Sequence, residues 1–333
     1  MSVDEVSDQL VGAFQNPALL LGIPLALAGA VFMSLGAQYQ HRGVTKVERL
    51  SGADGATGLT WHQIRALLTR PSWILGTLML GLAIICQLSA LAIAPLIVVQ
   101  PLGAIALVMT TLLNARVSGH APTRRSLTSI LACVGGIFLF VFLAAIFATE
   151  KDVTTENLFV ILTTLLVVII ILGACWLILR HRMRALFYVI GAGVLYGFVA
   201  TLAKVIIKRL QAENFDWLTL VCVIALIAAA AVGAYFVQTA YSSGPPDLVI
   251  AGLTVVDPIV AVVIGIVVLG EAAAAPVWAL VAFVAIGAVA VWGVVGLARY
   301  HPQVLSESQE LGIARGSDGQ AMPDGKPASE RDQ

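Results

Sequence analysis

Charged residues are scarce in this sequence, at 11% of 333 residues, whereas hydrophobic residues make up 59% and the mean hydropathy is +0.95. A soluble domain of this length does not need so much apolar surface, so the composition predicts an all-α polytopic membrane protein. The apolar runs are uninterrupted and about twenty residues long, which excludes a transmembrane barrel with its alternating segments of about ten. The formal net charge is zero, so no basic nucleic-acid surface is implied.

Several chemical motifs are also missing. The sequence has no Walker loop, no HExxH, no GxSxG and no pair of intramembrane carboxylates, so an enzyme activity is not expected. The four cysteines stand inside apolar runs without CxxC spacing, which predicts small packed residues rather than disulfides or metal ligands. The N-terminal stretch MSVDEVSDQL is acidic and carries no Lys or Arg, which argues against a cleaved signal peptide.

Nine apolar runs have the length of membrane-spanning helices. They are predicted at Ala18 to Tyr39, Trp73 to Ile93, Pro95 to Asn114, Leu127 to Phe147, Leu158 to Leu179, Ala185 to Ile207, Trp217 to Tyr241, Leu248 to Gly270, and Val277 to Leu297. A polar tail follows over residues 300–333 and is expected to be disordered. The segment GLTWHQIRALLTRPSW after the first span has the pattern of a short helix lying on the membrane surface.

Lys and Arg are unevenly divided between the two sets of loops. Eleven lie in the loops after the first, third and fifth spans, and three lie in the opposite loops. Because positive loops stay in the cytoplasm, the sequence predicts a protein of the cytoplasmic membrane with residues 1–17 outside and the C-terminal tail inside.

The chain resembles itself across five spans. The third span contains VVQPLGAIALVMTTLLN and the eighth contains VVDPIVAVVIGIVVLGE, so that Gln100 aligns with Asp257 and Pro101 with Pro258. Equivalent helices five crossings apart run in opposite directions, which indicates an inverted repeat. The first repeat covers residues 18–147, a linking helix covers 158–179, and the second repeat covers 185–297. Two such halves suit alternating access to a site between them.

Asp257 is the leading candidate for a binding residue. A carboxylate near the middle of a span costs on the order of 3 kcal/mol or more, so it is read as functional by default, to bind a cation or hold a proton. A structural hydrogen bond to a neighbouring helix is the alternative. The prolines at 101 and 258 are expected to break their helices beside the site, because proline lacks a backbone N–H.

Four further residues are candidates for the same site. Lys204 shares a helix face with Tyr196 and lies near the outer end of its span, where extension to the interface competes with a role as partner or gate for Asp257. Gln87 and Gln100 each need a hydrogen-bonding partner in the membrane, from the cavity or from another helix. Tyr196 is either a stacking surface for a substrate or a buried aromatic.

The stretch AYSSGPPDLVIAGLTVVDPIVAVVIGIVVLGE resembles the second-half signature of the drug/metabolite transporter superfamily, of the EamA type. The sequences QYQHRG and ALAIAPLIVVQPLGAIALV resemble the NIPA-type branch, whose members are associated with magnesium transport. The resemblance implies a bundle of two inverted repeats. Ten spans are usual in the wider superfamily, so a tenth helix stays open.

The sequence therefore predicts a secondary transporter for a small solute or ion, with no cofactor and with H⁺ as a candidate coupling ion. A Mg²⁺ permease is one alternative, although Asp257 would be its single intramembrane carboxylate and Mg²⁺ prefers several oxygen ligands. A flippase for a lipid-linked intermediate is another. The expected partners are the substrate and membrane lipids, without nucleic acid, and a homodimer is compatible with the sequence.

Overall fold

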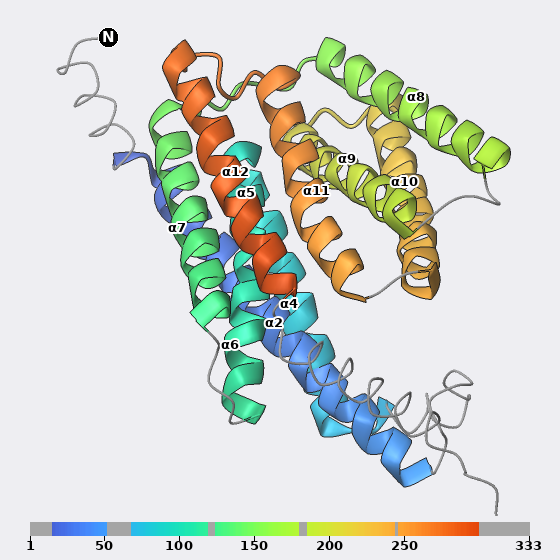
Figure 1. Ribbon diagram of the computed structural model, residues 1–333. Coiled ribbons are helices and arrows are strands. Elements are labelled where there is room, and N and C mark those ends of the chain that lie inside the picture. Colours follow the sequence, from blue (N-terminus) through green and yellow to red (C-terminus); the bar gives the residue numbers. More distant parts are fainter. Residues whose placement is uncertain (1–14, 52–67, 119–123, 180–184, 244–245, 300–333) are drawn as a thin grey trace, which may run out of the picture.

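The computed structural model describes residues 15–51, 68–118, 124–179, 185–243 and 246–299, and this part of the chain is helical without strands (Figure 1). The helices are α2 (Pro17–Ser51), α4 (Pro71–Ile93), α5 (Leu96–Gly103), α6 (Ile105–Ser118), α7 (Arg124–Phe147), α8 (Thr155–Leu179), α9 (Ala185–Gln211), α10 (Trp217–Ser243), α11 (Pro246–Val267) and α12 (Val277–Arg299). Within these ranges nine helical spans are long and apolar enough to cross a membrane, α5 and α6 together making one of them. This confirms the predicted class of multi-pass helical membrane protein.

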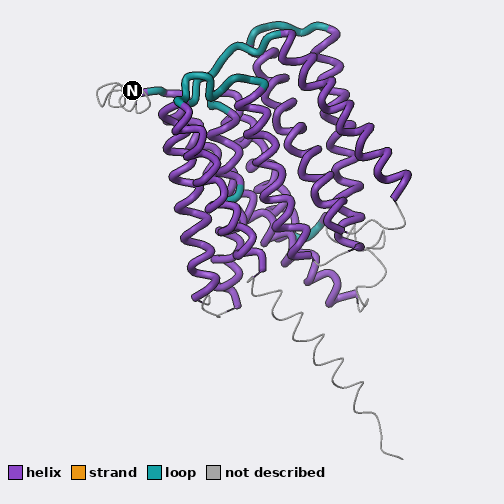
Figure 2. Tube along the Cα trace, turned by 45° about the horizontal axis from the view of Figure 1, so that its top comes forward, coloured by secondary structure: helices purple, strands orange, loops and turns teal. Residues whose placement is uncertain are grey.

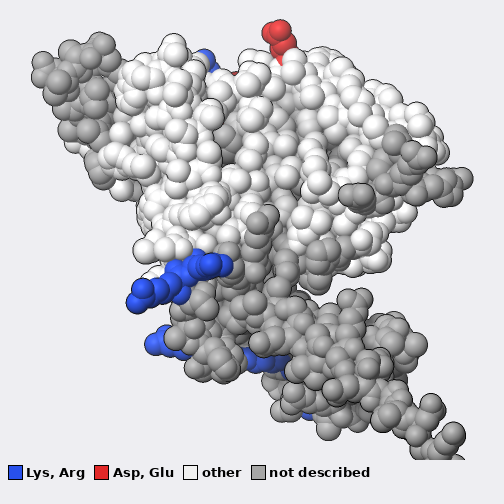
Figure 3. Space-filling view, viewed as in Figure 1, with Lys and Arg blue, Asp and Glu red and all other residues white. Residues whose placement is uncertain are grey.

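The helices begin and end at two opposite ends of the bundle. We call one the acidic end, where Glu150, Glu156, Glu213, Asp216 and Glu271 lie in or beside the connecting segments. Its described loops are gathered together in Figure 2. We call the other the basic end, which carries Arg42, Arg70, Arg116, Arg124 and Arg125. Figure 3 shows blue side chains at the basic end below a broad uncharged band, as expected for a surface that faces lipid.

The helices pack into two bodies. In the first body α2 packs on α4, α5 and α6, while α7 packs on α12. In the second body α9 packs on both α10 and α11. The linking helix α8 makes only limited contact with α9 and α10, and it lies obliquely beside the second body in Figure 1. Small residues allow the close pairs, since a Cβ added at Gly136 would lie 2.9 Å from Ala290 across the α7–α12 contact.

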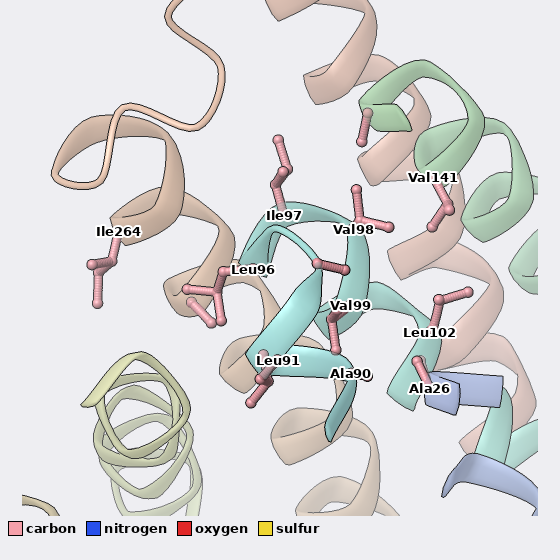
Figure 4. Packing of buried hydrophobic residues seen from close by; sticks show 14 of the residues in the cluster. Ala26, Ala90, Leu91, Leu96, Ile97, Val98, Val99, Leu102, Val141 and Ile264 are labelled. Carbon is pink, nitrogen blue, oxygen red and sulfur yellow. The ribbon is translucent and has the colours of Figure 1, made fainter. Parts of the chain in front are cut away.

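The two bodies share a core near the acidic end. Figure 4 shows the first turns of α5 at its centre, with Ile264 of α11 on one side and Val141 of α7 on the other. Toward the basic end, a separate apolar cluster belongs to α9, α10 and α11, with two side chains of α8 packed against it; its buried members are Tyr188, Val189, Ala192, Phe236, Ala240 and Val249. The packing that joins the bodies is therefore concentrated at the acidic end.

The two prolines behave differently from the prediction. Helix α11 continues through Pro258, so the expected break there is wrong. Val256 and Val260 pack against α9 on both sides of the proline, which supports the helix where one hydrogen bond is missing. Helix α5 does end shortly after Pro101, at Gly103, and α6 begins again at Ile105. The eighth span is also shorter than predicted, because α11 ends at Val267.

Two predicted segments cannot be compared with the structure. The surface helix expected after the first span falls mainly on residues 52–67, and the C-terminal tail covers 300–333, both outside the described residues.

Asp216 caps the first turn of α10 and provides a test of this end of the bundle. The backbone N–H of Thr219 donates to Asp216 Oδ1 at 3.0 Å, and Arg209 pairs with the same oxygen at 2.8 Å. The Thr219 N–H above all, with Arg209 and the Thr219 hydroxyl, holds the pKa of Asp216 below its ordinary value of 3.8. Its stabilisation is therefore present at neutral pH and is lost as the pH falls through this lowered pKa.

We predict that Asp216→Ala lowers the melting temperature of the detergent-solubilised protein at pH 7. The difference from wild type should shrink once the pH falls below 3.8, when the wild-type carboxyl begins to lose its charge. Thermal unfolding at several pH values measures this, with Asp152→Ala as a control because Asp152 is an exposed acid. A difference that stays constant down to pH 3 would contradict the capping role.

Candidate functional site

A buried ion cluster lies where the two bodies meet at the acidic end. Lys204 of α9 is only 2% exposed, and its Nζ donates to Ala94 O at 2.7 Å and to Glu150 Oε1 at 3.1 Å. The same Nζ lies 3.3 Å from Glu271 Oε1. Lys208, one turn further along α9, pairs with Glu150 at 2.9 Å. We call these four side chains the Lys204 cluster. Its charges balance, two ammonium groups against two carboxylates, as burial requires.

Glu271, in the other half of the chain, caps the N-terminus of α5. Its Oε1 and Oε2 accept hydrogen bonds from the backbone N–H groups of Leu96 and Ile97, at 2.7 and 2.8 Å. These are N–H groups that a helix cannot satisfy internally, and a carboxylate there also suits the helix dipole. The side chain is 2% exposed, so it is held by these bonds and by Lys204 rather than by water.

The segment after α11 is shaped to bring Glu271 into the bundle. Gly270 has a φ of +68°, a left-handed conformation that glycine adopts at little cost, and it reverses the chain just before the glutamate. Glu271 N–H donates to Gly265 O at 2.9 Å, while Thr149 N–H donates to Glu271 O at 2.7 Å. The side-chain amide of Asn157 donates to Val268 O. Gly265 leaves the space that the carboxylate fills, since an added Cβ would lie 2.9 Å from Glu271 Oε2.

Lys204 was expected to extend to the interface or to serve Asp257, and the structure shows a different arrangement. Its side chain is buried and bonded to Ala94, Glu150 and Glu271. The reason is that a tight turn between α4 and α5 exposes backbone oxygen and nitrogen within the bundle, and these groups require charged or polar partners.

Asp257 lies farther from the acidic end than the Lys204 cluster, on the side of α11 between the directions of α9 and α5. Val256 and Val260 face α9, where a Cβ added at Gly193 or Gly197 would come within 2.7 Å of them, and Gly265 faces Leu96 of α5. At 3.6 residues per turn, Asp257 falls between these two directions. Its Oδ1 is buried and has no hydrogen-bond partner among the described residues. An unpaired buried carboxylate oxygen is costly, which marks the residue for a ligand or a proton.

The exposure of α11 changes along this same side. Ile250, near the basic end, is 38% exposed, whereas Ala261 and Ile264, nearer the acidic end, are 0% and 7% exposed. Asp257 stands between them and is half-buried. The side of α11 that carries Asp257 is thus more exposed toward the basic end than toward the acidic end.

The end of α5 reaches about the same depth as Asp257, and Gln100 lies about one turn nearer the acidic end. Gln100 is buried one turn from Leu96 on the α11-facing side of α5. Counting from the contact between Leu96 and Gly265, Gly103 lies about 10 Å down α5 and Asp257 about 12 Å down the antiparallel α11. A Cβ added at Gly103 would meet no atom within 4 Å. The break between α5 and α6 therefore borders free space at the level of the acid.

The other two candidates, Tyr196 and Gln87, lie in different parts of the bundle. Tyr196 lies within electrostatic range of Asp257, and its ring packs 3.1 Å from the position of a Cβ on Gly233 of α10. Gln87 is half-buried on α4, with its backbone close to Gly29 of α2, inside the first body. The structure thus groups Asp257 with Tyr196 and puts Gln100 about one turn nearer the acidic end, while Lys204 belongs to the cluster at that end.

Glu150 and Glu271 were not selected from the sequence. Glu271 is the last residue of the run VVDPIVAVVIGIVVLGE, and Glu150 lies in the polar segment between the fourth and fifth predicted spans. A signal for both existed in Lys204, because a lysine inside an apolar helix requires a buried acidic partner. Among the described residues, no three His, Cys, Asp or Glu side chains lie close enough to share an ion.

A cavity of about 310 Å³ lies apart from these groups, between α8, α9 and α10. Its lining is apolar and includes Leu172, Gly173 and Trp176 of α8, facing Leu195, Val232 and Phe236. It carries no charged side chain, so it adds no chemistry to the candidate site.

Comparison with known proteins finds a distant relative. A protein of Corynebacterium glutamicum is 26% identical over 256 residues, which cover 76% of this chain and 86% of the relative. It bears the name of an uncharacterized protein, so no activity comes from it. No model of a protein family matches the chain, and no solved structure matches it.

The glycine contact beside Asp257 provides a second test. A Cβ at Gly197 would lie 2.7 Å from Val260 Cβ and 3.0 Å from Asp257 O, so Gly197→Ala should push α11 away from α9. We expect a loss of about 1–3 kcal/mol of stability, the usual cost of overpacking, seen as a lower melting temperature.

Gly135→Ala is the matched control, because an added Cβ there meets nothing within 4 Å. Alanine is also favoured over glycine inside a helix, so this variant should match or exceed the wild-type melting temperature. Equal losses in the two variants would contradict the close packing of α9 on α11.

Proposed function

We propose that the protein is a secondary transporter that moves a small solute by alternating access to a site at Asp257. The observation that carries the proposal is the buried, unpaired Oδ1 of Asp257 in the middle of a membrane helix. That oxygen lies on a side of α11 that is more exposed toward one end of the bundle than toward the other. In each end state of a carrier, the binding site is likewise accessible from one side of the membrane and closed to the other.

The proposed inverted repeat is supported by corresponding contacts in the two halves. In the first half α2 packs on α4 and also on α5 and α6. In the second half α9 packs on α10 and also on α11. The alignment of VVQP with VVDP makes α11 the equivalent of α5 and α6, so α9 and α10 are the equivalents of α2 and α4. This correspondence, with the sequence signature, is our basis for proposing membership of the drug/metabolite transporter superfamily.

The distribution of basic residues supports an orientation. The described arginines of the basic end lie on the side assigned to the cytoplasm by the positive-inside rule. We therefore place the protein in the cytoplasmic membrane, with its acidic end outside. The structure then represents a state sealed to the outside, with the Asp257 side of α11 more exposed toward the cytoplasm.

Asp257 favours a cation or a proton as the species it binds. Lys204 is neutralised by two glutamates, so it does not supply the missing positive charge. A cationic group on the substrate, or a proton exchanged with it, would satisfy the free carboxylate oxygen, and Tyr196 provides an aromatic ring nearby. Proton coupling follows if substrate and proton compete for this one carboxylate.

The test compares cells that lack the protein with cells that express wild type or Asp257→Asn. We expect at least one small solute to change its ratio of internal to external concentration when the protein is absent, and wild type to restore the ratio. Asp257→Asn keeps the shape of the side chain but removes its charge, so it should reach the membrane at normal level and fail to restore the ratio. Mass spectrometry of cells and medium measures this.

Asp152→Asn is the matched control, because it removes an exposed acid from the acidic end and should restore the ratio fully. If Asp257→Asn restored the ratio as well as wild type, the assignment of the site to Asp257 would be wrong.

A further inference from the structure

We propose that Lys204 is the gate residue of the acidic end, the charged group of α9 that must leave the α4–α5 turn before that end can open. The inference rests on the proposed alternating access. It concerns the contacts that keep the acidic end closed in one of the two states. It goes beyond the transport site, because Lys204 lies at the acidic end whereas Asp257 lies about two turns of α11 below Gly265.

Lys204 fastens the second body to three separate segments. Ala94 lies at the turn between α4 and α5, Glu150 lies between α7 and α8, and Glu271 lies between α11 and α12. The lysine itself stands near the end of α9. Any movement that separates α9 from the turn between α4 and α5 must break the 2.7 Å bond to Ala94 O.

The remaining members of the cluster keep a partner when Lys204 leaves. Glu271 stays bonded to the N–H groups of Leu96 and Ile97, and Glu150 stays paired with Lys208. Neither carboxylate is left as an isolated buried charge, which is the costly outcome when one member of a buried pair is removed. The Lys204 ammonium alone loses its contacts, and it would gain water from the opened end.

This arrangement makes the seal reversible. A gate built from one isolated buried pair would leave an uncompensated carboxylate on opening, whereas here each glutamate has a second donor in place. The contact between Leu96 of α5 and Gly265 of α11 is kept together with the bonds of Glu271, so the movement frees α9 from the α4–α5 turn without breaking those bonds. Lys204 is thus the specific polar fastening of the contact between α9 and the α4–α5 turn.

The experiment measures how fast a cysteine beneath the cluster reacts from each membrane face. Ala261→Cys places a thiol at a fully buried position of α11, between the cluster and Asp257. Cys86, Cys175 and Cys222 are replaced by alanine, and Cys133 is kept, because it is buried between α7 and α12 and reports general loosening. A membrane-impermeant maleimide is applied to vesicles of both orientations, and exposed Asp152→Cys identifies the acidic face.

We expect Ala261→Cys to react slowly from the acidic face and about tenfold faster when combined with Lys204→Met, because the open state gains population. Methionine keeps the length and apolar stem of lysine and removes its charge. Lys208→Met is the matched control, since Lys208 is one turn away, contacts Glu150 alone and is more exposed. It should leave the rate unchanged, and Cys133 should stay unreactive in every variant.

An unchanged rate at Ala261→Cys in the Lys204→Met protein would overturn the proposal. A rise that Cys133 shares, or that Lys208→Met reproduces, would also overturn it, because it would reflect loosening or lost surface charge. Should Lys204→Met fail to reach the membrane, Glu271→Gln provides the same readout: it keeps an acceptor for α5 and removes the charge facing Lys204, so acidic-face reactivity must rise.

The outcome is separable from that of the proposed function. If Lys204→Met opens the acidic face while Asp257→Asn restores the solute ratio, the gate stands and the transport site is elsewhere. If Asp257→Asn fails to restore the ratio while the acidic face stays closed in Lys204→Met, the transport site stands and the gate is wrong.

Discussion

The hydrogen bonds from Leu96 and Ile97 to Glu271 are the constraint on which the rest of the structure depends. A helix that begins inside an apolar bundle exposes N–H groups that lipid cannot satisfy. The second half of the chain supplies the missing acceptor, and that carboxylate in turn needs a cation, which is Lys204. The α5 N–H groups require the carboxylate of Glu271, and that carboxylate requires Lys204, so α5, α9 and the segment after α11 meet at one point. This meeting point determines which end of the bundle is closed.

Much of the fold could be predicted from the sequence, because each span is long, apolar and bounded by polar loops. All nine predicted spans have a helical counterpart in the described chain, and most boundaries agree within a few residues. The errors came from local rules that packing overrides. Proline at 258 removes a hydrogen bond without breaking α11, since glycines of α9 hold the valines on both sides of it.

The site was harder to predict than the helices. Asp257 and Gln100 could be selected because a polar group in an apolar run is visible in sequence, and the structure places them within about one turn of each other in depth. Glu271 stands 67 residues from Lys204 and 175 from Leu96, so its role depends on tertiary contacts that no local pattern contains. Gly270 and Gly265, which turn the glutamate inward and leave it space, become meaningful only once the partner helices are known.

The pairing of α12 with α7 has a consequence for how the chain is assembled. The last described helix belongs by sequence to the second half, yet it packs on the first body, so the chain returns across the molecule before it ends. During synthesis α7 emerges without the neighbour that covers Cys133 and Gly136, and it must wait for about 130 more residues before α12 arrives. The first half of the polypeptide lacks the helix that completes its body, so the mature bundle depends on both halves of the chain rather than on two independently folded parts.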